Sequence, residues 1–151
     1  MHWSQVFQVD VPAKPSGLWT LVAEYVRGPA LIKVEAPADG LWNYSEASGC
    51  VADGDLLSLV SSQGCLLRGA PVGALIAKVG GSTAGTTDGT MFLAGRSCIY
   101  EVNKDTRGPL YLSINDEPTG MVNNSGRLRV TVSIGPIAVV PPQEPPAVPQ
   151  N

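Results

Sequence analysis

Oxygen-bearing side chains are concentrated in the stretch NDEPTGMVNNSG, residues 115–126, which lies between two apolar runs. Asp116, Asn123 and Asn124 offer carboxylate and amide oxygens, and a glycine such as Gly120 lets the chain leave a strand so that neighbouring side chains can converge. Calcium takes about six to eight oxygen ligands of these kinds. Because the same residue types also fill surface turns, composition alone favours an ordinary polar turn.

Other catalytic patterns find less support in the sequence. The only histidine is His2, beside the chain terminus, so no imidazole base is available to a serine or cysteine nucleophile. The glycines at 80–85 are followed by a strand-like run instead of a helix, which argues against a phosphate-binding loop. Loop carboxylates could serve glycoside hydrolysis, but their spacing singles out no acid and base. These candidates are Asp39, Glu46, Asp53, Asp55, Asp116 and Glu117. We therefore expect a protein that is not an enzyme.

Length and composition indicate one domain with a real core. The chain has 151 residues, of which 44% are hydrophobic and 15% charged, with a net charge of -3. No basic field is present to attract nucleic acid. The sequence shows neither the apolar core of a signal peptide nor a run near the roughly 20 apolar residues that span a bilayer. We expect no membrane insertion and a protein that is cytoplasmic as synthesised.

Three cysteines occur, at positions 50, 65 and 98. This number is odd, and the spacing lacks the pairs of a zinc site, so free thiols are the expected state. The sequence leaves a Cys50–Cys65 disulfide open as an alternative.

Strand patterns dominate the chain, whereas 17 Gly and 13 Pro interrupt any long helical stripe. Eight short apolar or alternating runs are expected to be strands, and CIYEV at 98–102 is a ninth candidate. The eight are QVFQVDV, LWTLVAEYV, ALIKVEA, LLSLV, ALIAKVG, TMFLAG, LYLSIND and RLRVTVSI. In the last, Leu128, Val130, Val132 and Ile134 should face the core, and the alternate residues should face water. The pattern predicts an antiparallel β-sandwich of jelly-roll type.

The C-terminal segment 136–151 differs from the domain expected over residues 1–135. It has six prolines, which supply no backbone N–H and fix φ, so it cannot form a central strand. It is either a disordered tail or an extended segment that packs on its own domain or on a partner.

From residue 73 to residue 134 the sequence resembles the PA-IL-like galactophilic bacterial lectins, which are small calcium-dependent β-sandwiches, and this resemblance implies a galactose-binding-domain-like fold. GALIAKVG and GTMFLAG are followed by GPLYLSINDEPTGMVNNSGRLRVTVSI. The final hairpin of that family reads strand, Asn-Asp, six residues, Asn-Asn-Ser-Gly, strand. Residues 115–126 reproduce both the residue types and the spacing. The N-terminal half is similar only loosely.

The resemblance implies a Ca2+ ion held by the side chains of Asp116, Asn123 and Asn124 and by two backbone carbonyls, those of Gly120 and Tyr44. Two adjacent sugar hydroxyls would complete the coordination shell. The implied sugar-binding set consists of Tyr44, Gln63, Asp116, Glu117, Asn123 and Asn124.

The sequence also departs from that family. Its sugar pocket uses a histidine shortly before the glutamine, and here Val60 stands in the place of the histidine, so galactose specificity is left open. Glu117 is acidic where the family tolerates an apolar residue; it either reinforces the cation or faces water.

Two functions follow from these patterns. The first is a calcium-dependent, carbohydrate-binding lectin-like module that binds a glycan and forms a homo-oligomer, since association of weak sites raises avidity. The second is a structural or assembly protein whose sandwich and Pro-rich tail dock partner subunits.

Overall fold

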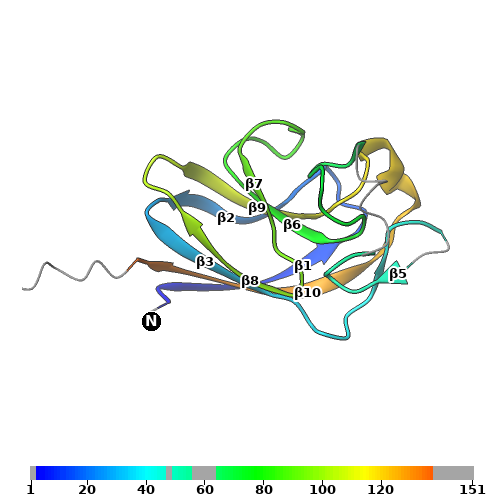
Figure 1. Ribbon diagram of the computed structural model, residues 1–151, viewed down its shortest axis with the longest axis horizontal. Coiled ribbons are helices and arrows are strands. Elements are labelled where there is room, and N and C mark those ends of the chain that lie inside the picture. Colours follow the sequence, from blue (N-terminus) through cyan, green and yellow to red (C-terminus); the bar gives the residue numbers. More distant parts are fainter. Residues whose placement is uncertain (1–2, 47–48, 56–63, 138–151) are drawn as a thin grey trace, which may run out of the picture.

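The computed structural model describes residues 3–46, 49–55 and 64–137. It consists of two antiparallel sheets, which face each other as the two layers of a sandwich (Figure 1). The predicted all-β sandwich is therefore confirmed. Within the described residues, no helix is long and apolar enough to cross a membrane.

The larger sheet has the order β5-β4-β10-β3-β8, with β1 also paired to β10. Its strands are β1 (Gln5–Pro12), β3 (Ala30–Glu35), β4 (Trp42–Asn43), β5 (Gly49–Cys50), β8 (Ser97–Val102) and β10 (Ser125–Pro136). The smaller sheet has the order β2-β9-β6-β7. Its strands are β2 (Thr20–Arg27), β6 (Leu75–Val79), β7 (Thr90–Leu93) and β9 (Arg107–Ile114). A 3-10 helix, η2 (Pro118–Asn123), lies between β9 and β10.

Strand β10 shows how the sequence pattern becomes a buried face. Leu128, Val130, Val132 and Ile134 are all buried, as their alternation predicts. Ser133, expected on the wet face, is buried as well, because β10 is paired on both sides there, with β1 and with β3. A strand covered at both edges leaves little room for water around a short side chain.

The core fills the space between the sheets. The inner faces contribute aliphatic residues that are fully buried, such as Val34 and Val130 from the larger sheet and Leu75 and Leu112 from the smaller one. Burying each such side chain contributes about 1.5–3 kcal/mol relative to an exposed position. Two rigid layers thus hold the loops that join them.

Several predictions need correction or lie outside the described residues. The two-residue strands β4 and β5 and the helix η2 were not expected, because a two-residue strand is too short to show alternation. The run LLSLV falls within 56–63, outside the described residues. At the predicted domain boundary, β10 continues to Pro136, which pairs with Ala30, and residues from 138 on are not described.

Candidate functional site

The stretch 115–124 connects the two sheets. Strand β9 belongs to the smaller sheet and β10 to the larger one, so the chain must cross the sandwich between them. The crossing is made by η2, which begins with Pro118, a residue suited to a first helical turn because it has no N–H to leave unpaired. Figure 1 shows this crossing at the end of the sandwich where β5 also lies. A chain that leaves both ladders has backbone and side-chain oxygens free to face inward.

Two side chains of this stretch have buried oxygens without a partner. Asp116 is 8% exposed and Asn124 is 5% exposed. Within the described part of the chain, Asp116 Oδ2 and Asn124 Oδ1 are the buried side-chain oxygens that accept no hydrogen bond. Leaving a buried acceptor unsatisfied costs about 1–3 kcal/mol, and more for a charged group. Their coincidence in one loop indicates a site for a group that supplies positive charge.

The remaining polar atoms of these two side chains fix their orientation. Asn124 Nδ2 donates to the carbonyl oxygen of Ala13 at 2.9 Å, which turns Oδ1 the other way. Asp116 Oδ1 accepts the N–H of Glu117 at 2.7 Å, which leaves Oδ2 as the free oxygen. The two free oxygens are therefore held in place by the fold itself.

Burial raises the pKa of the Asp116 carboxyl above its ordinary value. The neighbouring Asn124 side chain and the N–H of Glu117 lower this pKa in part, while the negative charge of Glu117 raises it further. A carboxylate that is costly to ionise, and that pairs with no Lys or Arg side chain among the described residues, fits the same interpretation as the free oxygens.

The preceding residue, Asn115, is fully buried and holds a neighbouring segment in place. Its Oδ1 accepts the N–H of Leu67 at 2.8 Å, and its Nδ2 donates to the carbonyl oxygens of Leu67 and Ala70, each at 3.0 Å. In addition, the N–H of Leu66 donates to the carbonyl oxygen of Asp116 at 3.1 Å. The segment 64–72 is thus fastened to the loop, a role of Asn115 that the sequence did not reveal.

Tyr44 lies close to the loop through strand pairing. Asn43 pairs with Ser125 and Trp42 with Gly126, so the antiparallel register leads Tyr44 toward Asn124. Gly126 has a φ of 86°, which favours glycine, and it lets β10 approach Trp42 closely. The Tyr44 hydroxyl donates to Asp55 Oδ2 at 2.7 Å.

The other predicted residues are arranged less uniformly. Asn123 is exposed at the end of η2. Gly120 lies within η2, and a Cβ added there would lie 3.4 Å from Asp116 Oδ1. Glu117 is exposed, and its carboxylate lies beside Gly64. The predicted sugar contact Gln63 is outside the described residues. The structure thus brings Asp116 and Asn124 together at the centre, with Asn123 and Glu117 at the surface.

A hollow of about 410 Å³ lies beside η2. Pro118, Cys65 and Gly64 line it on the side of the candidate site, and Thr86 and Thr87 line it from another loop. This volume is within the usual range for small-molecule sites.

All three cysteines are free thiols, as expected. Burial, followed by the charges of Asp116 and Glu117, raises the pKa of Cys65 to about 11. Burial and the charge of Asp55 likewise raise the pKa of Cys50 to about 11. Both thiols are protonated at neutral pH, which makes them poor nucleophiles. The position of Cys65 beside the site was not foreseen from the sequence.

Trp42 stands two residues before Tyr44 in the chain and could stack on a sugar ring, but it is a core residue that is 1% exposed. Its Nε1 donates to the carbonyl oxygen of Gly73 at 2.8 Å. Trp19 is buried as well.

Among the described residues, no three His, Cys, Asp or Glu side chains are grouped so as to hold a metal. The candidate site offers one buried carboxylate together with amide and backbone oxygens. Such a set of ligands suits a hard cation such as calcium and does not suit zinc, which prefers nitrogen and sulfur.

Comparison with known proteins supports the fold. The solved N-terminal domain of EclA, described as a PllA-like lectin, is similar with a TM-score of 0.56 and 18% sequence identity. The match covers 85% of this chain and 96% of the other. No protein-family model and no curated protein matches the sequence. The chain therefore has a lectin-like fold.

Proposed function

We propose that this protein binds carbohydrate through a calcium ion held in the loop between β9 and β10. The observation that carries the proposal is the pair of buried, unpartnered oxygens, Asp116 Oδ2 and Asn124 Oδ1. A cation would compensate both at once, and it would remove the cost of ionising a buried carboxylate. The lectin-like fold makes a sugar the expected ligand.

The residues that would hold the ion are Asp116 and Asn124 from the buried part of the loop and Asn123 from its surface. Backbone carbonyls of Gly120 and Tyr44 would complete the protein ligands. When bound, calcium supplies open coordination positions that a vicinal diol of a sugar can fill with two oxygens together. The chain itself fixes Asp116 and Asn124 through the bonds to Glu117 and Ala13.

The surface around the ion would determine which sugar is bound. The hollow beside Pro118 and Cys65 offers space for the rest of the glycan. The carboxylate of Glu117, which lies beside Gly64 of the lining, can accept a hydroxyl hydrogen. Since Val60 replaces the histidine of the similar lectins, we propose calcium dependence without assigning galactose.

A glycan array probed in calcium and in EDTA tests the proposal, with calcium binding measured separately by calorimetry. We expect binding to a defined set of glycans that EDTA abolishes and that Asp116→Asn abolishes in calcium. Asp88→Asn is the matched control, because it removes a carboxylate from a different loop, where Asp88 pairs with Lys78.

The proposal is wrong if calorimetry detects no calcium binding, or if glycan binding is insensitive to both EDTA and Asp116→Asn. Strong binding to a protein partner that EDTA does not affect, with no glycan bound, would favour an assembly function instead.

A further inference from the structure

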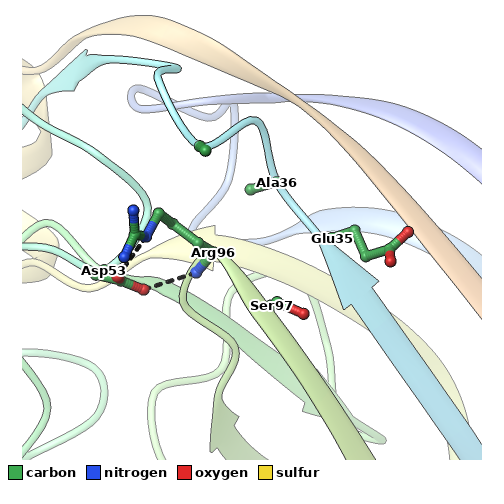
Figure 2. Close-up of a pocket in the computed structure, with 6 residues that line it drawn as sticks. Glu35, Ala36, Asp53, Arg96 and Ser97 are labelled. Atoms are coloured by element: carbon green, nitrogen blue, oxygen red, sulfur yellow. Dashed lines mark hydrogen bonds and ion pairs between the residues drawn. The ribbon is translucent and has the colours of Figure 1, made fainter.

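A second hollow, of about 550 Å³, is formed by residues outside the loop between β9 and β10. It lies where three segments meet: the end of β3 with the residues after it, the segment after β5, and the turn between β7 and β8. Its lining consists of Glu35, Ala36, Ala38, Asp53, Arg96 and Ser97 (Figure 2).

Arg96 is held in a defined orientation by Asp53. The backbone N–H of Arg96 donates to Asp53 Oδ1 at 2.8 Å, and its side-chain Nε donates to Oδ2 at 2.6 Å (Figure 2). The neighbouring Gly95 has a φ of 63°, and a Cβ there would lie 2.7 Å from Asp53 Oδ1. This tight turn therefore depends on glycine.

The other edge of the guanidinium is free to bind. In the described part of the chain, the two terminal nitrogens of Arg96 donate no hydrogen bond, and the side chain is 50% exposed. A planar guanidinium fixed at Nε offers donors in a rigid fork that matches two adjacent acceptor oxygens.

The opposite side of the hollow supplies the carboxylate of Glu35 and the hydroxyl of Ser97. Glu35 and Ser97 pair across β3 and β8, and the N–H of Ala36 donates to the carbonyl oxygen of Arg96 at 2.8 Å. In Figure 2, Asp53 and Arg96 lie on one side, with Ser97 and Glu35 on the other. Ala36 and Ala38 add small apolar surfaces that leave room for a ring.

The charges around the hollow favour a neutral ligand. Arg96 is already neutralised by Asp53, and Glu35 is paired with Lys33 at 2.9 Å. An anion entering the hollow would meet two carboxylates, whereas a hydroxyl group can both donate to a carboxylate and accept from the guanidinium. This mixture of donors and acceptors matches a polyhydroxylated molecule.

We propose that this hollow is a second, metal-independent binding site for a neutral sugar. Adjacent hydroxyls accept from the terminal nitrogens of Arg96, and others donate to Glu35 or Asp53. Since none of the described residues that line the hollow is aromatic, binding is weak for a single sugar. Together with the calcium site, it allows one copy of the domain to hold a glycan at two points, which raises avidity.

The test is a 1H–15N NMR titration of the full chain in EDTA, which removes calcium and so prevents binding at the proposed calcium site. Methyl β-galactopyranoside and methyl α-mannopyranoside serve as neutral probes, and N-acetylneuraminic acid serves as the anionic probe. We expect saturable shifts of the backbone amides of Ala36, Asp53 and Ser97 with at least one neutral probe.

Arg96→Ala should weaken this binding about tenfold or more, since bonds to a charged donor are lost. Arg129→Ala is the matched control, because Arg129 also pairs with an aspartate, Asp10, but lies outside the hollow. Arg96→Lys keeps the charge without the fork and should also bind more weakly than wild type.

The proposal is overturned if no neutral probe gives saturable shifts, if Arg96→Ala binds as wild type does, or if only the anionic probe binds. The result is separable from that of the calcium site. Failure in EDTA leaves calcium-dependent glycan binding untouched, and absence of calcium binding leaves these titrations unchanged.

Discussion

Two loops of this sandwich differ in how their carboxylate and carbonyl oxygens are paired with positive charge. The loop at 80–89 is organised by Lys78, which is fully buried and donates to the carbonyl oxygen of Ser82 at 2.7 Å and to Asp88 at 2.9 Å. The loop at 116–124 has a buried carboxylate and a buried amide oxygen, yet neither free oxygen has a donor. One loop contains its own cation, and we propose that the other binds one.

The surroundings of the two loops sharpen the contrast. The Lys78 ammonium lies 4.5 Å from the ring centroid of Trp19 and 5.2 Å from that of Tyr111, so two aromatic faces add to its stabilisation. Trp19 in turn donates to the carbonyl oxygen of Gly85 at 2.8 Å. A loop whose buried side-chain oxygens all accept hydrogen bonds is structural, whereas a loop with unpaired buried oxygens is a candidate for binding.

The largest expected effect comes from removing the internal cation. Lys78→Met should lower the free energy of unfolding by about 2–4 kcal/mol, because the loop loses the hydrogen bonds from the ammonium to the carbonyl oxygens of Ser82 and Gly85 and its ion pair with Asp88. Urea denaturation measures this loss, and added calcium should not restore it.

Lys33→Met provides the control for that change. Lys33 pairs with Glu35 at the surface, and an exposed pair contributes about 0–1 kcal/mol. Equal losses for the two variants would contradict a structural role for the buried lysine.

The loop at 116–124 should respond in the opposite sense. In EDTA, Asp116→Asn should match or exceed wild type in stability at neutral pH, because it removes a buried charge that has no counter-charge. In calcium at 100 times the dissociation constant, wild type should gain about 2.7 kcal/mol and the variant should not. Thermal and urea unfolding with and without calcium would show this crossover. Parallel curves for the two proteins would contradict it.

The pKa values of the two aspartates, Asp116 and Asp88, are shifted in opposite directions, so their effects on stability should depend on pH with opposite signs. The pKa of Asp116 is raised by burial, so without a cation the folded state binds more protons than the unfolded state, and stability falls as pH rises from about 3.9 through the raised pKa. The pKa of Asp88 is lowered, first by its hydrogen bond with Lys78. Its contribution is present above the unfolded pKa and is lost as pH falls through the folded pKa.

Carbon-detected NMR of the carboxyl groups in EDTA measures both pKa values. Added calcium should lower the pKa of Asp116 and leave that of Asp88 unchanged. Equal responses of the two groups would end the distinction between the loops.

The sequence predicted the parts of this comparison that depend on local pattern. Alternation at 127–134 predicted strand β10, and the resemblance of residues 115–126 to the lectin hairpin, in residue types and spacing, singled out the loop. By contrast, Lys78 lies in the run ALIAKVG, where a charged residue in a strand suggests a wet face. Its burial depends on Trp19, which lies far away in the sequence just before β2, and on Asp88, which lies in the loop between β6 and β7.

Asn115 illustrates the same limit within the site. In the sequence it is one more amide side chain of the polar stretch, whereas in the structure its amide is bonded to the backbone of residues 67–71. Only the three-dimensional path of that segment distinguishes a structural asparagine from a binding one.

The smallest effect on stability is expected at Asn123, which is exposed and makes no side-chain hydrogen bond among the described residues. In EDTA, Asn123→Ala should change the free energy of unfolding by no more than about 0.5 kcal/mol. As a calcium ligand, however, its loss should weaken calcium binding about tenfold, which corresponds to about 1.4 kcal/mol. Asn123→Asp should tighten calcium binding, because affinity rises with the charge of the ligands. Calorimetry measures the calcium affinity of the two variants. A weaker affinity for Asn123→Ala and a tighter one for Asn123→Asp would identify Asn123 as a ligand of the ion. Two unchanged affinities would restrict the side-chain ligands to Asp116 and Asn124.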